Sequence, residues 1–334
     1  MNTIDLKGKK VLFIAPKFFG YEIQIVQAMQ KLGATVFFHG DKPSENRWAK
    51  VVLRLFPKLV WFFADRIYID WLDKQQLGSC DVVFIVKGEA VSPNYLRVLH
   101  QRYPTAKFIF YMWDSIANVK HTLSKLVFFD SVSSFDPLDC QAYPQIRYRP
   151  LFFIDQYQQK SELTNKSGLF FFGTLNGDRP RVLARVIRTL NRDVKFDYWL
   201  FVRSKWELIF RKLIDNSFAV IEKDRLLFVP VPASEIKQRM SACNCVLDIE
   251  HPKQTGLTMR TFEVLASGKK LITTNQSIRN EDFFDPCNIC IIDRSNPIIP
   301  DGFITSPCNP IPASFYLRNS INGWLGELFL NSKN

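Results

Sequence analysis

Short continuous runs of apolar residues alternate along this chain with longer stretches in which apolar residues recur every three or four positions. Residues 9–15 form the first apolar run, residues 21–32 the first helical stretch, and residues 34–39 the second apolar run, with Gly33 at the end of the helix. A continuous apolar run of this length is typical of a strand buried on both faces. The pattern therefore predicts a parallel β–α–β unit at the start of the chain.

The same alternation continues through most of the sequence, with one interruption. A polar stretch, residues 155–167, separates the two series and is interpreted as a linker. Before the linker we predict strands at 81–86, 107–113 and 127–135 and a helix at 92–103. After it we predict strands at 168–173, 196–202, 226–231, 245–250 and 269–274 and helices at 179–190, 233–243 and 258–267.

Strands alternating with helices in two series predict an α/β protein with two Rossmann-like, doubly wound domains facing a cleft. We place the first domain at residues 1–154, the second at 155–310, and a helical tail at 311–334. The tail is expected either to cross back onto the first domain or to form a simple C-terminal cap. A chain of 334 residues is long enough for two domains.

The net charge of +12 favours an anionic partner, which is a nucleic acid, an anionic lipid or a phosphorylated substrate. The basic residues are spread along the chain and no RNA- or DNA-binding motif is present, so we do not expect nucleic acid as the partner. The N-terminus has no apolar signal region, and no run of about 18 apolar residues occurs. These features predict a cytoplasmic protein.

The metal-binding residue types show no convincing pattern. The seven cysteines are odd in number, and the Cys287–Cys290 pair has no second pair at zinc-site spacing. The four histidines are scattered, and no Asp-X-Asp occurs. We therefore expect reduced thiols, no metal site and no cofactor. A dehydrogenase is also disfavoured because the GxGxxG motif is missing.

Ligands of open α/β sheets bind beyond the carboxyl ends of the strands, so the loops after predicted strands are the first candidate sites. The loop after 168–173 holds glycines and arginines suited to a diphosphate at the start of a helix. Alternatively, this loop is an ordinary turn capped by Asp178 and binds no ligand. The candidate residues are Gly173, Thr174, Asn176 and Arg179.

The segment 251–263 gives the strongest signal. A glycine-containing loop precedes a helix that begins at Thr258, which places free N–H groups where a phosphate can bind. Glu263, inside this helix, can accept hydrogen bonds from ribose hydroxyls. Alternatively, Thr258 is only a helix N-cap and Glu263 is a solvated residue of the helix. The candidate ligand-binding residues here are His251, Thr255, Gly256, Leu257, Thr258, Arg260 and Glu263.

This segment resembles the donor-binding motif of GT-B glycosyltransferases, especially bacterial surface-polysaccharide and CgeB-like members. The likeness in motif spans residues 251–275, and the matching positions are Gly256, Leu257, Arg260, Thr261, Phe262, Glu263, Ala266 and Gly268. The resemblance implies a nucleotide-sugar donor, with its ribose on Glu263 and its phosphates on Thr258 and Arg260. Retaining members often carry a second glutamate where this chain has Thr255, so inversion is favoured.

An inverting enzyme needs a general base near the acceptor hydroxyl, and we expect the first domain to supply it. Two acids follow predicted strands there: Asp114, our first candidate, and Glu89, our second. Asp114 followed by serine is also typical of a simple cap. Gly20, Tyr21 and Glu22, in the first strand–helix loop, are expected to line the acceptor side.

Residues 47–66 alternate basic and large apolar side chains, which is typical of a helix on a membrane surface, although a helix covering the first sheet gives a similar pattern. The sequence thus predicts a metal-independent, inverting glycosyltransferase that acts on a lipopolysaccharide, capsule or other surface-glycan acceptor, with a peripheral contact to the cytoplasmic face of the inner membrane. The alternatives are a nucleotide-sugar epimerase of the two-Rossmann type and a basic protein that binds nucleic acid or another anion.

Overall fold

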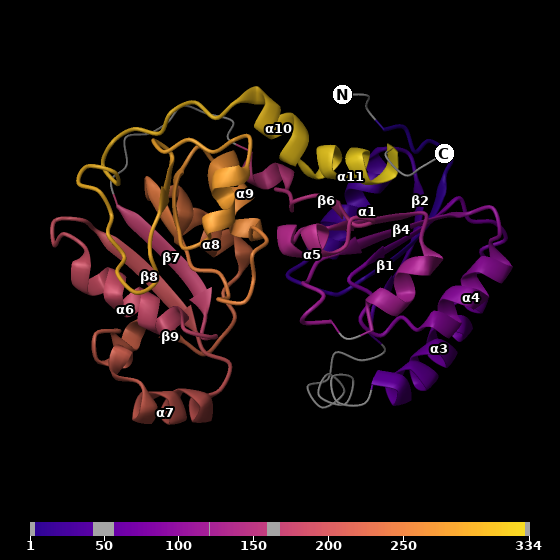
Figure 1. Ribbon diagram of the computed structural model, residues 1–334, viewed down its shortest axis with the longest axis horizontal. Helices are drawn as coiled ribbons and strands as arrows, with labels where there is room; N and C mark the ends of the chain where they lie inside the picture. The colour runs from indigo at the N-terminus through magenta and orange to yellow at the C-terminus, as the bar shows by residue number, and fades with distance from the viewer. Residues whose placement is uncertain (1–3, 43–56, 120, 159–167, 331–334) are drawn as a thin grey trace. The chain divides into compact units, whose positions relative to one another are not determined.

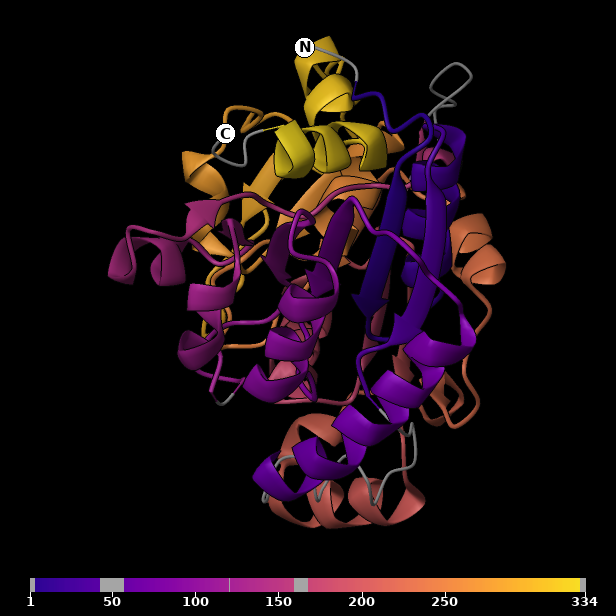
Figure 2. The same cartoon turned by 90° about the vertical axis from the view of Figure 1, so that its right-hand side faces the viewer.

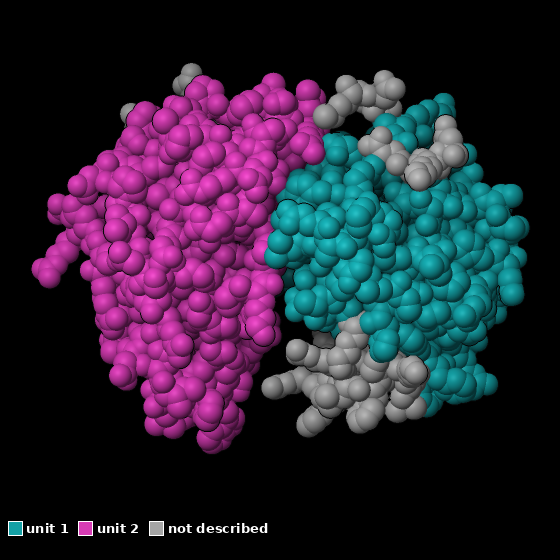
Figure 3. Space-filling view, in the orientation of Figure 1, with its two compact units in different colours: residues 1–150, 321–334 teal, residues 151–320 magenta. Residues whose placement is uncertain are grey.

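The computed structural model describes residues 4–42, 57–119, 121–158 and 168–330. The chain divides into two compact units (Figures 1 and 3). Unit 1 comprises residues 1–150 and 321–334, and unit 2 comprises residues 151–320. The chain thus passes from unit 1 to unit 2 at Pro150 and returns after Ser320, so that its last helix belongs to the first unit.

The described part of unit 1 contains a six-stranded sheet in which every neighbouring pair is parallel. The strand order is β2-β1-β3-β4-β5-β6, so the order reverses between β1 and β3. The strands are β1 (Lys10–Ala15), β2 (Thr35–Gly40), β3 (Val82–Val86), β4 (Lys107–Met112), β5 (Ser131–Ser134) and β6 (Arg147–Tyr148). The almost fully apolar β1, β3 and β4 are buried on both faces, as expected for parallel strands covered by helices.

Helices cover both faces of this sheet. α3 (Pro57–Lys74) and α4 (Pro93–Arg102) share one core with alternate residues of β1, β3 and β4 (Figure 2). α1 (Tyr21–Lys31) and α11 (Ile321–Leu330) pack together on the opposite face, where Trp324 contacts the rings of Phe84 and Tyr111. A short α5 (Pro137–Ala142) and a 3₁₀ helix, η1 (Leu123–Phe128), complete the described unit.

Unit 2 repeats the architecture with a different strand order. Its parallel sheet runs β12-β11-β10-β7-β8-β9, which places the reversal between β7 and β10. The strands are β7 (Leu169–Thr174), β8 (Phe196–Phe201), β9 (Leu226–Leu227), β10 (Cys245–Asp248), β11 (Lys270–Thr273) and β12 (Ile289–Ile291). The helices are α6 (Arg179–Thr189), α7 (Lys205–Ile214), α8 (Ala233–Ser241), α9 (Met259–Ala266) and α10 (Ala313–Asn319), with 3₁₀ turns η2 (Asp155–Tyr157), η3 (Asn216–Ala219), η4 (Lys223–Arg225) and η5 (Gln276–Asn280).

The predicted fold class, α/β with two Rossmann-like domains, is confirmed by these two parallel sheets. Three predicted elements differ in detail. The strand predicted at 127–135 shortens to β5, because η1 occupies its beginning. The strand predicted at 226–231 shortens to β9, and the helical tail breaks at Ser320 into α10 and α11.

Candidate functional site

The reversal of strand order in unit 2 brings two loops together. The β7–α6 loop and the β10–α9 loop both start at carboxyl ends of neighbouring strands. A side chain on Gly177 would meet Pro252 at 3.3 Å and His251 at 3.5 Å, so the two loops are in close contact. Gly177 also has a positive φ of 55°, a conformation that favours glycine. This is the position at which open α/β sheets bind ligands.

Arg179 joins these two loops. Its Nε donates to the carbonyl oxygen of Ile249 at 2.7 Å, and its Nη1 donates to that of Thr174 at 2.8 Å. The guanidinium lies so close to β7 that a side chain on Gly173 would come within 2.9 Å of the Arg179 Cδ and 2.7 Å of Phe171. Arg179 and Gly173, both predicted to meet a diphosphate, therefore have a structural role that the sequence did not reveal.

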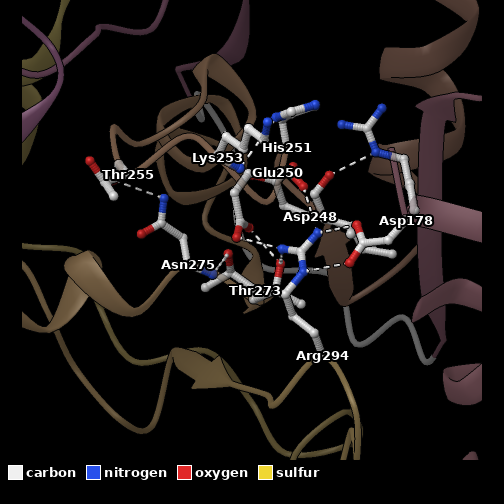
Figure 4. A network of polar contacts seen from close by, with 12 residues as sticks. Asp178, Asp248, Glu250, His251, Lys253, Thr255, Thr273, Asn275 and Arg294 are labelled. Atoms are coloured by element: carbon white, nitrogen blue, oxygen red, sulfur yellow. Dashed lines mark hydrogen bonds and ion pairs between the residues drawn. The ribbon is translucent and has the colours of Figure 1, made fainter. Parts of the chain in front are cut away.

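Arg294, in the loop after β12, links the same two loops by charge (Figure 4). Its guanidinium donates to both carboxylate oxygens of Asp178, at 2.6 and 3.0 Å. It also donates to the Glu250 carboxylate at 2.7 Å and to the Thr274 hydroxyl at 2.9 Å. Asp178 makes no side-chain cap to its helix. The hydrogen bonds from Arg294 instead lower the pKa of this aspartate below its usual range.

Two acids at the end of β10 are held inside the same network. Glu250 is buried and accepts a hydrogen bond of 2.5 Å from the Thr274 hydroxyl. Asp248 accepts one of 2.5 Å from the hydroxyl of Thr258. Burial raises the pKa of both carboxyls, with the hydrogen bonds acting in the opposite direction. The side chain of Thr258 thus binds Asp248 and does not cap α9.

The β10–α9 loop is fixed from its other side by the loop after β11. The Asn275 side chain donates to the carbonyl oxygens of Thr255 and Gly256, at 3.1 and 3.2 Å. The Ser277 hydroxyl also donates to Thr255, at 2.6 Å. Leu257 is buried in the interior. The loop that precedes α9 is therefore preorganised, and it leads into the N-terminus of this helix, toward which the N–H groups of the first turn point.

Glu263 and Arg260 lie together within α9. Their carboxylate and guanidinium are 3.8 Å apart, and the side chain of Glu263 is only 3% exposed. The helix packs against η2, where the charge of Glu263 helps to raise the pKa of Tyr157 after the larger effect of burial. The alternative of a solvated glutamate is therefore wrong, since Glu263 faces the interior.

In unit 1, the two candidate bases, Asp114 and Glu89, both lie close to the ammonium group of Lys87. The Lys87 ammonium is 2.8 Å from Asp114 and 4.0 Å from Glu89, and Lys42 lies 2.8 Å from the same oxygen of Glu89. Asp114 also accepts hydrogen bonds from the Ser115 amide and the side chain of Asn118. Burial would lower the pKa of Lys87, but the neighbouring acids outweigh it and raise that pKa.

Two further charged groups are buried in this cluster. Asp41 follows β2, is fully buried, and accepts the amide hydrogen of Glu89 at 3.2 Å. Its other oxygen has no hydrogen-bond partner among the described residues, and burial raises its pKa to about 6. Lys125 donates to the Gly88 carbonyl at 2.7 Å, and burial lowers its pKa to about 8.

The β1–α1 loop places aromatic side chains at the carboxyl end of the first sheet. Glu22 is buried and accepts the amide hydrogen of Phe18 at 3.0 Å, which holds the loop in shape. Gly20 precedes α1 with a φ of 80°. The ring of Tyr21 lies 5.9 Å from that of Trp113, which follows β4, so aromatic surface gathers beside the predicted acceptor residues.

The structure brings the predicted donor residues of two separate loops together, and it adds residues that the sequence analysis missed. These are Arg294, Asn275, Asp41, Lys87 and Lys125. Position after a strand end was an available signal for Asn275, Asp41 and Lys87. For Arg294, and for Lys125 in η1, no local signal existed.

Part of the predicted basic segment, residues 47–56, lies outside the described residues, and the rest belongs to α3. There Phe62 and Phe63 are exposed, whereas Ala64 is buried in the core that α3 shares with the first sheet. The alternative of a helix that covers the first sheet is therefore correct for α3. Over the described residues, no helix has the length and apolar character needed to cross a bilayer. In the same residues, no three His, Cys, Asp or Glu side chains are grouped so as to hold a metal ion.

Comparison with known proteins reveals similarity at the level of structure. No family model and no curated protein sequence matches the chain. HepE of Anabaena, solved in complex with UDP and glucose, is 12% identical with a TM-score of 0.56, over 97% of this chain and 100% of that chain. The catalytic domain of starch synthase IV from Arabidopsis thaliana, bound to ADP and acarbose, is 11% identical with a TM-score of 0.54, over 86% and 88%.

A glycosyltransferase from Rickettsia africae is also similar, at 12% identity and a TM-score of 0.55, over 85% of this chain and 84% of that chain. These matches cover 85–97% of this chain, so they include both Rossmann-like units and not one of them alone. At such low identity the likeness establishes the shared two-Rossmann fold.

Proposed function

We propose that this chain is a metal-independent glycosyltransferase that binds a nucleotide-sugar on unit 2 and transfers the sugar, with inversion, to a surface-glycan acceptor such as a lipopolysaccharide or capsule precursor. The observation that carries the proposal is the pair of preorganised loops at the strand-order reversal of the second sheet. The UDP and ADP named in the HepE and starch synthase complexes support a nucleoside diphosphate as the ligand.

The donor diphosphate is proposed to bind at the N-terminus of α9. The N-terminal end of the helix dipole and the guanidinium of Arg260 supply positive charge there. As the sugar–phosphate bond breaks, negative charge develops on the leaving diphosphate, and these groups stabilise it. The carboxylates of Asp248 and Glu250 are already engaged in this region, by the Thr258 hydroxyl and by Arg294.

The proposed ribose site depends on Glu263, whose side chain is almost fully buried. The substitution Glu263→Gln preserves shape and removes charge. The ribose role predicts that nucleoside diphosphate affinity falls at least tenfold, which is about 1.4 kcal/mol. Asp224→Asn, at an exposed acid of the same unit, is the matched control. Unchanged affinity in a folded Glu263→Gln variant, measured by calorimetry, would remove Glu263 from the ribose site.

Glu89 is the base that the geometry of unit 1 favours. Both oxygens of Asp114 are engaged, by Lys87 on one side and by Ser115 and Asn118 on the other. Glu89 has one oxygen paired with Lys42 and the other without a partner among the residues described. A free carboxylate oxygen can accept the proton of an acceptor hydroxyl while that hydroxyl attacks the anomeric carbon.

The experiment follows release of nucleoside diphosphate from UDP-, GDP- and dTDP-sugars in the presence of a lipid extract that contains glycan acceptors. Glu89→Gln should abolish release while donor binding persists, and Asp114→Asn should retain more activity. If Asp114→Asn alone abolishes turnover, the base is Asp114. An epimerase would instead convert the nucleotide-sugar into its epimer without releasing diphosphate, and that product would refute the transferase proposal.

The proposed setting is the cytoplasmic face of the inner membrane, where lipid-linked glycans are assembled. Residues 47–66 remain the segment of unit 1 that we predict to contact this membrane. The exposed phenylalanines of α3 support that prediction.

A further inference from the structure

Helix α7 turns its apolar stripe toward solvent. Its large apolar residues recur at helical spacing on one face: Trp206, Ile209, Phe210, Leu213 and Ile214. Trp206 is 80% exposed and Leu213 is 79% exposed, and the other three are more than half exposed. An amphipathic helix of a globular domain normally buries this stripe against the core. Single apolar residues on a protein surface are common, but here the exposed residues form one continuous stripe.

The packing of α7 explains why the stripe stays outside. Only Leu208 of the helix is buried, and it belongs to the core of unit 2. The helix lies at the lower edge of the unit in Figure 1, beyond α6 and β9, where it packs against η3. Arg211 pairs with Glu207 at 3.2 Å and donates to the Gly177 carbonyl at 3.1 Å. These contacts fix the orientation of the helix and leave its apolar face free.

The loop after β9 extends this apolar surface. Phe228 and Val229 are exposed, and Val229 is followed by Pro230. The Lys205 ammonium lies 5.8 Å from the centre of the Phe228 ring, which connects the loop to α7. We define the α7 surface as the apolar residues Trp206, Ile209, Phe210, Leu213, Ile214, Phe228 and Val229.

Basic side chains accompany the apolar ones. Arg203, Lys205 and Lys212 are all exposed along the helix and just before it, whereas its one acid, Glu207, is already paired with Arg211. The free charge carried by this element is therefore positive. Trp, Phe and branched apolar residues beside free lysines and arginines are the composition of a helix that lies in a membrane interface.

We propose that the α7 surface docks unit 2 on a membrane that contains anionic phospholipids. The apolar stripe inserts among the acyl chains near the headgroups, and Lys205 and Lys212 meet lipid phosphates. Charge argues against a second copy of the chain as occupant, since two such helices face to face would oppose like charges. The proposal does not depend on glycosyl transfer, because it rests on the exposed stripe and its charges alone.

The experiment measures cosedimentation of the full chain with vesicles of phosphatidylcholine alone and of phosphatidylcholine mixed with phosphatidylglycerol. The double variant Trp206→Ser/Phe210→Ser should lower the partition onto mixed vesicles by about tenfold or more, because two large anchors are lost. Lys205→Gln/Lys212→Gln should weaken binding to mixed vesicles and leave any binding to neutral vesicles unchanged.

Matched variants separate this surface from others. Ile298→Ser/Leu317→Ser removes two exposed apolar residues elsewhere in unit 2 and should keep wild-type binding. Phe62→Ser/Phe63→Ser tests α3 of unit 1. Absence of vesicle binding by the wild type overturns the proposal, as does a loss that occurs only in the α3 variant. Light scattering that shows a dimer dissociated by Trp206→Ser/Phe210→Ser would assign the surface to a second copy.

Discussion

Replacing Arg294 with methionine tests whether charge holds the carboxyl-end loops of the second sheet in place. The substitution removes five hydrogen bonds from the guanidinium to Asp178, Glu250 and Thr274. Breaking a fully buried ion pair costs roughly 3–5 kcal/mol. The side chains of Arg294 and Asp178 are 23% and 30% exposed, so water replaces part of the loss, whereas Glu250 is buried. We expect about 2–3 kcal/mol of destabilisation.

The assay is thermal unfolding followed by calorimetry, with hydrogen exchange of the β7 and β10 amides to identify the transition of unit 2. For a domain of this size, 1 kcal/mol shifts the melting temperature by about 2–4 °C, so Arg294→Met should lower it by about 4–12 °C. Adding Glu250→Gln should recover part of the loss, because the uncompensated buried charge is then removed. A fall below about 1 °C would refute the network as a source of stability.

Three further predictions concern packing and pH. Gly173→Ala should destabilise unit 2 by about 1–3 kcal/mol, measured in urea, because the new methyl meets Phe171. Burial raises the pKa of Asp41 to about 6, so the folded chain binds a proton that the unfolded chain has released. The free energy of unfolding should therefore fall by about 3 kcal/mol as pH rises from about 4 to about 6. Asp41→Asn should flatten this fall. Trp324→Ala should cost about 3–5 kcal/mol in a urea melt, since the fully buried indole leaves a cavity.

The strands that the sequence predicts best are those buried on both faces. In β1, β3 and β4 the run of apolar residues is continuous or follows a single lysine, and the structure places strands there to within one residue. The strand predicted at 226–231 ends at Leu227 in the structure. Pro230 and Pro232 have no N–H for a ladder, and the exposed Phe228 and Val229 show that apolar character there does not reflect burial.

The helical tail shows a limit of periodicity. Its pattern predicts one helix, but Ser320 adopts an extended conformation and bridges to Phe153, which ends α10 and starts α11 in the other unit. The pairing partner lies far away in the sequence, so no local pattern contains it. Tertiary contacts decide this break.

The site shows the same division between local and distant information. The rule that ligands bind after strand ends led to the β7–α6 and β10–α9 loops, which the structure brings into contact. It did not reveal Arg294, which lies 116 positions from Asp178 and 44 from Glu250. Its place follows from the strand order of the sheet, in which β12 stands beyond β10 and β11. A sequence pattern without that order cannot pair these residues.

Unit 2 is proposed to bind a nucleoside diphosphate at the paired loops, and a thermal-shift screen of the purified chain tests this binding. The ligands are UDP, GDP, CMP, dTDP and their sugars, with NAD and a short RNA as controls. A ligand at 100 times its dissociation constant stabilises by about 2.7 kcal/mol. We expect a rise in melting temperature with one nucleoside diphosphate, and protection of the amides of residues 173–179 and 249–258 from hydrogen exchange. No shift with any nucleotide, together with a shift caused by RNA, would contradict it.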